Sequence, residues 1–447
     1  MAVKPARFYV DDRPDEGVFR VHRDVYSDPE IFELEMKYIF ERTWNFLTVE
    51  TQLAKPHDYI TTWIGRTPVV VSRDAKGNIC AFLNTCRHKG ATVCRFEKGN
   101  AKFHVCFYHG WAYDSAGKIV SIKQREAADY PAAFDAQSHD LIPLAKLATY
   151  KGLIFGSLSP DVPPLEEHLG DLKFFIDLHM EQGPQGMEII PGRVAYTYRG
   201  NWKMQLENGQ DPYHVDTAHG SFMAIAERRR KGQGNTAAKE QDWQKRNNVQ
   251  IGAYEFPYGH SSIWHEVAEP ERRAIYATLD EIKQRVGPLK ADWMVKMRNA
   301  VFFPNLQIAD QIVPILRTFR PIAPNLTELR SNVIGPIGEP PVLRAARLRQ
   351  FEDFVNPGGY ATPDDVTVFA DCQTGFSATG VDFLQGYSRG LGVIERGAND
   401  EAREAELHPL TSVKGHRTQN TELGTHAPFR EWVRLMEAGM AGRKAYP

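Results

Sequence analysis

The first part of the chain carries the residue pattern of an amphipathic helix. Apolar residues recur at helical spacing between Ile31 and Trp44. Asp28 precedes this run as a capping residue, Pro29 suits the first helical position, and Glu30 places an acid in the first turn. The sequence therefore predicts a helix that begins after Asp28 and extends towards Trp44.

After Pro56 the pattern changes to short runs that are rich in β-branched and aromatic residues. Turn-forming stretches with Asp and Gly, at 74–78 and 114–118, separate these runs. The predicted strands are 59–64, 69–71, 79–83 and 119–120. Together they predict a small antiparallel β domain over residues 47–160.

The remainder of the chain mixes helical and strand patterns and shows no internal repeat. A Pro-rich stretch at 160–164 predicts a linker, and the polar stretch 233–248 predicts a loop. A length of 447 residues favours two cores rather than one. We therefore expect residues 1–46 to form an N-terminal helical segment that packs on a large C-terminal domain, 161–447, with the β domain, 47–160, between them.

Composition and charge are those of an ordinary globular protein. The 54 Lys and Arg residues balance 56 Asp and Glu residues, which argues against nucleic acid or an anionic membrane as the main partner. An apolar run of the ~18 residues that a membrane span needs is missing, and the start lacks an apolar signal core. Four of the five cysteines lie within 80–106, which does not indicate a disulfide framework. We expect a cytoplasmic protein.

Two short segments of the β domain carry one thiol and one imidazole each. Cys86 and His88 form the first pair, and Cys106 and His109 form the second pair 17 residues later. A single tetrahedral zinc ion more often has like ligands paired within one segment. Two thiolates on one iron and two imidazoles on the other, bridged by sulfide, match a Rieske [2Fe–2S] centre, which transfers electrons.

Glycines lie close to both segments. Gly90 and Gly110 would let backbone N–H groups approach the sulfur atoms, as a buried anionic cluster requires. A structural zinc site, or four unrelated buried side chains, are the alternative interpretations. The other cysteines, Cys80, Cys94 and Cys372, fit core packing or incidental thiols better than the cluster.

A second candidate metal site lies in the C-terminal domain. His214 and His219, with a carboxylate, could occupy one face of Fe(II) and leave the opposite positions open for O2 and substrate. The histidines lie five residues apart, so a regular α-helix would splay them by roughly 140°. We therefore expect either an i→i+5 turn here or a helix that ends between them. Taken alone, such a pair is more often part of a core or a surface.

Both candidate sites belong to a longer series of motifs. In order and spacing, the series resembles the large (α) subunit of Rieske non-heme iron aromatic-ring-hydroxylating dioxygenases over most of the chain. The stretches 152–156, 165–170 and 354–371 resemble the benzoate, toluate and anthranilate 1,2-dioxygenase branch. The motifs that carry the family resemblance are Cys86-x-His88-Lys89-Gly90, Cys106-x2-His109-Gly110-Trp111, Asn201-Trp202-Lys203 and Glu207-Asn208-x2-Asp211-x-Tyr213-His214-x4-His219.

The resemblance implies roles for individual residues. His214 and His219 match the histidines that bind the mononuclear iron, and the third ligand is a carboxylate from far downstream. Asp365, the second acid of an Asp-Asp pair, is the best match for it. Asp364 is the fallback, and Asp371 is a weaker choice.

Asp211 matches an acid that connects the two metal sites in the family. That acid hydrogen-bonds a Rieske histidine of a neighbouring subunit, here His109, and an iron-binding histidine, here His214. Such a carboxylate would fix both tautomers and link the metals electronically, so the resemblance implies a catalytic role for Asp211. A plain helix cap is the alternative interpretation of this residue.

The resemblance further implies an α+β fold. The β domain would be a small antiparallel Rieske [2Fe–2S] domain, and the C-terminal domain would be catalytic, with an antiparallel sheet covered by helices in the helix-grip arrangement. The implied cofactors are one Rieske [2Fe–2S] cluster and one mononuclear Fe(II). The implied enzyme is a terminal oxygenase that uses O2 and electrons from NADH to cis-dihydroxylate an aromatic acid of the benzoate, 2-halobenzoate or anthranilate type.

The family also implies partners. Electrons would come from a separate reductase, with or without a ferredoxin, because the chain lacks a Gly-x-Gly-x-x-Gly element after a strand. A small β subunit and an α3 or α3β3 assembly are implied as well. An apolar pocket should hold the ring, and Gly220, which follows the second histidine, would leave extra room near the iron.

Three other functions remain open on the sequence. A Rieske monooxygenase that hydroxylates or demethylates a related aromatic substrate would use the same two metals. A Rieske electron carrier with an added interaction domain would lack the mononuclear iron. A zinc-binding structural protein would lack both iron centres.

Overall fold

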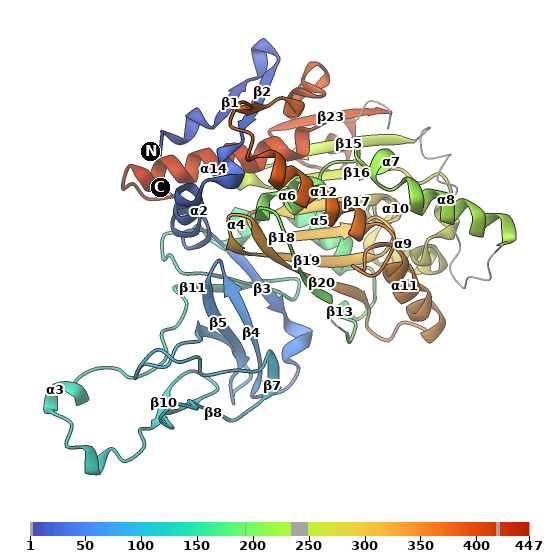
Figure 1. Cartoon of the computed structure of the whole chain (residues 1–447). Coiled ribbons are helices and arrows are strands. Elements are labelled where there is room, and N and C mark those ends of the chain that lie inside the picture. Colours follow the sequence, from blue (N-terminus) through green and yellow to red (C-terminus); the bar gives the residue numbers. More distant parts are fainter. Residues whose placement is uncertain (1–2, 193, 234–248, 417–420, 447) are drawn as a thin grey trace. The chain divides into compact units, whose positions relative to one another are not determined.

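The computed structural model describes residues 3–192, 194–233, 249–416 and 421–446 (Figure 1). The chain divides into two compact units, Phe40–Leu165 with Tyr446–Pro447 and Met1–Ile39 with Glu166–Ala445. Nearly all of the polar stretch 233–248, where the sequence predicts a loop, lies outside the described residues. The domain boundaries drawn from the sequence after residues 46 and 160 stay a prediction.

The smaller unit consists of short antiparallel strands. Its described strands are β3 (Asn45–Val49), β4 (Asp58–Ile64), β5 (Thr67–Arg73), β6 (Ile79–Leu83), β7 (Lys98–Asn100), β8 (Phe103–Val105), β9 (Ala112–Asp114), β10 (Ile119–Ser121), β11 (Lys146–Tyr150) and β12 (Leu153–Ser157). They form three sheets with the orders β6-β5-β4-β7, β10-β9-β8 and β11-β12-β3. A one-turn helix, α3 (Ala132–Asp135), lies between β10 and β11 in the sequence. The strands expected from the sequence are confirmed as β4, β5, β6 and β10.

Strand β5 supports two separate cores because its side chains alternate between the faces of the sheet. Val69 and Val71 belong to one buried cluster, and Val70 belongs to another. The cluster that contains Val70 also contains Cys86 and Cys106. The alternation of side chains along β5 thus places Val70 in the same apolar cluster as the two thiols.

The two Cys-His segments occupy different kinds of connection. The segment with Cys106 and His109 joins β8 to β9, which pair with each other, so it is the tip of a hairpin. The segment with Cys86 and His88 joins β6 to β7, which lie at opposite edges of the four-stranded sheet. The first segment is therefore not the tip of a hairpin, because β6 pairs with β5 and β7 pairs with β4.

The larger unit is organised around one wide antiparallel sheet. Its strands are β13 (Met187–Ile189), β14 (Val194–Tyr198), β15 (Gln250–Glu255), β16 (Ser261–His265), β17 (Met297–Phe302), β18 (Leu306–Asp310), β19 (Pro314–Ala323), β20 (Leu326–Pro336), β22 (Glu395–Arg396) and β23 (Thr411–His416). Within the described residues these ten strands run in the order β13-β20-β19-β18-β17-β16-β15-β23-β22, and β14 also pairs with β20. A second sheet joins β1 (Val10–Arg13), β2 (Val18–His22) and β21 (Phe383–Leu384).

Helices cover both faces of the wide sheet (Figure 1). The described α-helices of this unit are α1 (Asp24–Ser27), α2 (Pro29–Glu35), α4 (Leu165–Leu169), α5 (Leu172–Met180), α6 (Trp202–Asn208), α7 (Val215–Ala218), α8 (Gly220–Arg228), α9 (Leu279–Val286), α10 (Pro288–Val295), α11 (Pro341–Phe354), α12 (Thr362–Gly375), α13 (Asp400–Glu404) and α14 (Leu423–Met440). Arg298 and Asn299 point to opposite faces of β17. Arg298 donates to the carbonyl of Trp293 in α10, whereas Asn299 donates to the carbonyl of Gly209, just after α6. The α+β fold class is confirmed. None of the described helices has the length and apolar content of a bilayer span.

The N-terminal helix begins where the sequence predicts. The Asp28 carboxylate accepts hydrogen bonds from the backbone N–H groups of Glu30 and Ile31, at 2.7 and 3.2 Å. The α-helical part ends at Glu35 and a π-helical turn continues to Phe40. The helix therefore ends before Trp44, since β3 already begins at Asn45.

A buried ionic cluster ties this helix to α6 and α14. The Glu35 carboxylate is fully buried and accepts a hydrogen bond from the Lys203 ammonium at 2.6 Å. It also accepts from the indole N–H groups of Trp202 and Trp432, at 2.9 and 2.6 Å. The Asn201-Trp202-Lys203 motif thus has a structural use, because two of its side chains satisfy a carboxylate that would otherwise be buried without partners.

Candidate metal centres

The same pair of backbone hydrogen bonds closes each of the two Cys-His segments of the smaller unit. The N–H of Cys86 donates to the carbonyl of Ala91 at 2.8 Å, and the N–H of Gly90 donates back to the carbonyl of Cys86 at 3.0 Å. The segment that begins at Cys106 makes the equivalent bonds at 2.8 and 2.9 Å. Gly90 and Gly110 adopt φ values of 78° and 73°, a left-handed conformation that glycine adopts without strain. Each segment is therefore a preformed turn with its thiol at the start.

The two thiols and the two imidazoles of these segments differ in their exposure to solvent. Cys86 and Cys106 are buried, at 3% and 2% exposure, whereas His88 and His109 are half-buried. The Nδ1 atoms of the two imidazoles lie 3.0 Å apart, and their rings meet edge to face. This donor set, with two thiols inside and two imidazoles outside, fits a [2Fe–2S] cluster whose two irons have different ligands.

Polar hydrogens surround the sulfur atoms. Burial raises the pKa of the Cys106 thiol, while the backbone N–H groups of Tyr108 and His109 lower it. The Tyr113 hydroxyl lies 3.3 Å from Sγ of Cys86 and accepts the backbone N–H of Arg87. Its own proton can therefore point at the sulfur. Donors of this kind stabilise a thiolate and tune the metal it binds.

The remaining cysteines lie outside this set. Cys94 is buried, and its Sγ lies 3.3 Å from Nδ1 of His104. Burial raises the pKa of the Cys94 thiol to about 12, so it stays protonated and acts as a packing residue. Cys80 is half-buried and Cys372 is exposed.

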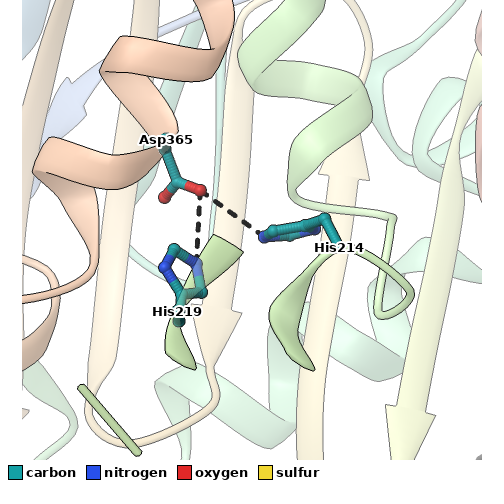
Figure 2. Close-up of side chains that lie close together, drawn as sticks. All are labelled: His214, His219 and Asp365. Carbon is teal, nitrogen blue, oxygen red and sulfur yellow. Dashed lines mark ion pairs between the residues drawn. The ribbon is translucent and has the colours of Figure 1, made fainter. Parts of the chain in front are cut away.

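In the larger unit, His214, His219 and Asp365 converge from two separate segments (Figure 2). The two histidines flank α7, and Asp365 lies in the first turn of α12. Oδ1 of Asp365 lies 3.5 Å from Nε2 of His214 and 3.3 Å from Nε2 of His219. One donor atom from each residue lies within 4.8 Å of the other two, which fits a single cation between them.

The spacing of the two histidines is accommodated by a break in the helix. α7 ends at Ala218, and α8 begins at Gly220. His219 lies between them with φ −100° and ψ 27°, outside the α-helical region. Of the two geometries expected from the sequence, the structure has the interrupted helix. This break lets side chains five residues apart face the same point.

A second carboxylate holds the far side of each imidazole. Oδ2 of Asp211 lies 3.2 Å from Nδ1 of His214, and Oδ2 of Asp364 lies 3.3 Å from Nδ1 of His219. A carboxylate at Nδ1 keeps the proton on that nitrogen. Nε2 of each ring is then free to bind a metal, as in other carboxylate–histidine–metal arrangements.

The electrostatic potential at the cluster favours a cation. Burial would lower the pKa of His214, but Asp211 and Asp365 overcome this and raise the pKa to about 10. Burial would raise the pKa of Asp365, but hydrogen bonds from the two histidines hold it far below its usual range. A site that retains positive charge this strongly fits a divalent cation, because the cation supplies the charge that the proton otherwise provides.

Asp211 combines both roles considered for it from the sequence. Its Oδ1 accepts the backbone N–H groups of Tyr213 and His214, at 2.6 and 3.3 Å, as a capping residue does. Its Oδ2 contacts the His214 ring at the same time. The expected contact with His109 of a neighbouring subunit stays a prediction.

Two further residues complete the cluster. The Asn208 amide Nδ2 donates to Asp365 at 3.0 Å and lies 3.2 Å from Nε2 of His214. Asn208 belongs to a motif named above, but its contact with Asp365 is not predictable from the sequence, because the two residues lie far apart in the chain. Asp364, the fallback ligand, contacts the second histidine from the side away from Asp365. Asp371 is exposed two turns further along α12.

Two cavities meet at the cluster, and Asn208, His214 and Asp365 line both of them. The smaller one, of about 40 Å³, lies against the wide sheet, and Gln307 and Arg317 line it together with apolar side chains. This lining is more polar than the apolar pocket expected from the sequence. The larger cavity encloses about 650 Å³.

Gly220 does not shape either cavity. It is exposed, and a Cβ atom built on it would meet nothing within 4 Å. The expectation that this glycine leaves extra room near the iron is therefore wrong. Gly209 has the opposite property, because a Cβ atom there would lie 2.1 Å from Nε2 of Gln307. A side chain at position 209 would displace Gln307 from the smaller cavity.

A buried acid borders the larger cavity. Tyr26 and Tyr387 each donate a hydrogen bond of 2.7 Å to the Glu207 carboxylate. Burial raises the pKa of Glu207 to about 7, and the nearby charge of Asp211 adds to this effect. Burial also raises the pKa of Glu422 to about 8, with Asp211 and Glu207 contributing.

The chain matches two family models. Residues 43–149 match the Rieske [2Fe-2S] domain, and residues 190–436 match the ring hydroxylating alpha subunit (catalytic domain). Each match contains one of the two donor sets described above. The resemblance drawn from the motifs is confirmed, and so is the predicted pair of iron cofactors.

Two relatives and one solved structure resemble most of the chain. The toluate 1,2-dioxygenase subunit alpha of Pseudomonas putida is 41% identical, over 90% of this chain and 88% of its own. The 2-halobenzoate 1,2-dioxygenase large subunit of Burkholderia cepacia is 40% identical, over 90% of this chain and 87% of its own. The crystal structure of naphthalene 1,2-dioxygenase from Rhodococcus sp. has a TM-score of 0.80 at 24% identity and covers 94% of both chains, which shows a shared fold.

These similarities extend through both units and both donor sets. They leave no place for the zinc-binding structural protein or for a simple electron carrier. The chain belongs to the ring-hydroxylating oxygenase alpha subunits, enzymes with a Rieske [2Fe–2S] domain and a catalytic domain for mononuclear iron.

Proposed function

We propose that this chain is the large subunit of a terminal oxygenase that cis-dihydroxylates an aromatic acid of the benzoate type. The observation that carries the proposal is the presence of both donor sets in one chain, one suited to a [2Fe–2S] cluster and one to Fe(II). The two relatives are named for toluate and 2-halobenzoate, both of which are substituted benzoates. Benzoate, its ortho-substituted forms and anthranilate are therefore the candidate substrates.

We assign the metal ligands as follows. Cys86, His88, Cys106 and His109 hold the [2Fe–2S] cluster. His214 and His219, each through Nε2, hold the mononuclear iron together with Asp365. When bound, the two centres supply the stored electron and the reductive activation of O2. Buried thiols and carboxylate-oriented imidazoles support this assignment.

The residues around the iron site control charge and orientation. Asp211 and Asp364 retain the protons at Nδ1 of the two histidines, so both rings present Nε2. Burial alone would raise the pKa of Asp365, but hydrogen bonds from His214 and His219 hold that pKa low, so Asp365 remains ionised. The Asn208 amide restrains the Asp365 carboxylate by a hydrogen bond. The protein therefore positions three ligands of one metal face without needing to rearrange them.

The assembly and the electron supply belong to the proposal as well. Electrons from NADH reach the chain through a separate reductase, with or without a ferredoxin. A small β subunit joins the chain in an α3β3 assembly, or the chain forms an α3 ring. Asp211 then lies against His109 of a neighbouring subunit, and its 24% exposure supports such a contact. Dependence on NADH supports a cytoplasmic location.

Product analysis tests the proposal. The purified protein, with its reductase, NADH and labelled O2, is supplied with benzoate, toluates, 2-halobenzoates and anthranilate. A cis-diol that carries two labelled oxygen atoms supports the dioxygenase, since both atoms then come from O2. A product with one labelled oxygen would instead support the monooxygenase and overturn the proposal.

Metal analysis tests the ligand assignment separately. The unsubstituted chain should bind about three irons, and Asp365→Ala should bind about two while keeping the absorption of the Rieske cluster. The reason is that Asp365 and the four cluster ligands belong to different units of the chain. Loss of the cluster absorption in Asp365→Ala would contradict the assignment.

A further inference from the structure

One buried arginine of the larger unit differs from the others. The described residues of this unit include four buried arginines: Arg273, Arg298, Arg317 and Arg347. Two of them pair with the Asp310 carboxylate, and a third pairs with the Glu339 carboxylate at 2.6 Å. Buried guanidinium groups normally need such a partner, because an unpaired charge in the interior is strongly unfavourable.

Arg317 is the exception. Its side chain is 7% exposed, and its Nε is buried without a hydrogen-bond partner. Among the described residues, no carboxylate lies within 4.0 Å of its guanidinium group, the limit for an ion pair. An arginine always carries its charge, so the guanidinium group of Arg317 can take an anionic partner from outside the described residues.

Two polar side chains flank Arg317 across the sheet. Arg317 lies in β19 opposite Gln307 of β18 and Ser331 of β20. Directly opposed residues of antiparallel strands point to the same face, so these three side chains form one row, which we call the polar row. Oε1 of Gln307 and Oγ of Ser331 are also buried without partners. The polar row therefore combines an unpaired guanidinium with polar side chains whose hydrogen-bonding capacity is not used within the described residues.

Two members of the polar row, Gln307 and Arg317, line the same cavity as the iron-site residues. Gln307 and Arg317 line the smaller cavity together with His214, His219 and Asp365. The larger cavity differs in charge, because Glu207, Asp211 and Glu422 line it and its described lining includes no Lys or Arg. A carboxylate ligand can therefore pair with a guanidinium group in the smaller cavity, whereas the described lining of the larger cavity offers it no Lys or Arg.

We propose that Arg317 binds the carboxylate of the aromatic acid substrate, with the amide N–H of Gln307 as a second donor. This inference rests on the proposed function and extends it to the residue that selects acids over neutral aromatics. A guanidinium can grip a carboxylate through two parallel hydrogen bonds, which fixes the orientation of the ring as well as its position. The ring then extends from the sheet towards the iron ligands, which line the same cavity.

Substrate entry requires some rearrangement. A cavity of about 40 Å³ holds only a few water molecules, so lining side chains must move to admit a ring. Met297 and Phe354 line this cavity, and the unbranched Met297 side chain can adopt several shapes. The anion site itself needs no such change, because Arg317 is held in a central strand.

Equilibrium binding to the purified holoenzyme tests the proposal. Dissociation constants of benzoate and of neutral benzamide are measured by calorimetry for the unsubstituted protein and for Arg317→Gln. We expect benzoate to bind about 100-fold more weakly to Arg317→Gln, because a buried charge loses its partner. The dissociation constant of benzamide should change by less than about threefold.

Arg320→Gln is the matched control. Arg320 lies three residues further along β19, on the opposite face, where it pairs with Glu328 at 3.2 Å. This variant should bind both ligands as the unsubstituted protein does. If Arg317→Gln does not fold, Arg317→Lys replaces it. Benzoate should then bind about tenfold more weakly, because lysine cannot make two parallel hydrogen bonds to the carboxylate.

The outcomes separate the inference from the proposed function. Unchanged benzoate affinity in the Arg317 variant, or equal affinity of the unsubstituted protein for benzoate and benzamide, would overturn the inference. If the unsubstituted protein forms diols from aromatic acids but does not need Arg317, only the inference fails. If benzoate binds through Arg317 but no diol forms from any acid, the proposed reaction fails and the inference holds.

Discussion

Asp364 and His219 are joined by a contact that orients the second histidine of the iron site. Oδ2 of Asp364 lies 3.3 Å from Nδ1 of His219, and Asp365 lies at the same distance from Nε2. Two consecutive residues of α12 thus hold both nitrogens of one imidazole. Asp364 leaves Nε2 available for a metal because it keeps the proton at Nδ1.

Asp364→Asn should weaken iron binding by about 10- to 100-fold. The amide of asparagine can donate to Nδ1, which favours the tautomer with its proton at Nε2, the nitrogen assigned to the metal. Titration of the metal-free protein with Fe(II) measures the change. Asp371→Asn, an exposed position on the same helix, is the control, and equal affinities in the two variants would rule out this role.

Asp211→Asn should preserve the fold while lowering turnover by about 100-fold at saturating iron. The asparagine oxygen can still accept the backbone N–H of Tyr213, so the turn remains. The negative charge at Nδ1 of His214 is lost, and with it the proposed link to the cluster. Turnover and cluster absorption are measured together, with exposed Asp216→Asn as the control. Normal turnover of Asp211→Asn would remove Asp211 from the electron path.

Glu207 should make the stability of the protein depend on pH. Burial raises its pKa from 4.5 to about 7, so the folded state keeps this proton while the unfolded state loses it. The resulting stabilisation is complete below pH 4.5 and is lost as the pH rises to about 7. Its full size is of the order of 3 kcal/mol.

Glu207→Gln should remove this dependence. Glutamine can keep contacts with Tyr26 and Tyr387 but does not titrate. The difference in unfolding free energy between the two proteins should therefore change by about 3 kcal/mol between pH 4.5 and 7.5. Chemical denaturation at several pH values measures it. Glu207 contributes to the raised pKa of Glu422, so the comparison is repeated in a Glu422→Gln background to isolate Glu207. Parallel stability curves in that background would refute the assignment.

Lys203→Met should destabilise the larger unit by about 3–5 kcal/mol. The substitution leaves the Glu35 carboxylate fully buried without its cationic partner. Adding Glu35→Gln in the same chain should recover part of the loss, because no unpaired charge then remains. Thermal unfolding compares these variants with Lys37→Met, an exposed position in the turn after α2. A loss no larger than that of the control would contradict the ionic role.

Local features were predictable because they depend on neighbouring residues. The cap at Asp28, the β4 and β5 strands and the glycine turns after each thiol all follow from short stretches of sequence. The five-residue spacing of the histidines likewise predicts either an i→i+5 turn or an interrupted helix, and the structure has the interruption, at His219.

Features that depend on distant pairing were not predictable. The connection that contains Cys86 runs from one edge of the four-stranded sheet to the other. This path depends on the order of all four strands, which no short stretch of sequence specifies. Arg317 lies in β19, and the residue pattern of this strand does not predict a binding site. Only the sheet register brings Arg317 beside Gln307. Asn208 similarly gains its role from Asp365, 157 residues further along the chain.

The break at His219 also determines how the protein responds to loss of iron. α7 and α8 meet at this residue, so the ligands on either side of α7 belong to a backbone joint rather than to one rigid rod. A cation bound at the proposed site would connect the residues on both sides of that joint. Removal of iron by a chelator should therefore increase local mobility, and the backbone amides near His219 should be the first to exchange their hydrogens faster.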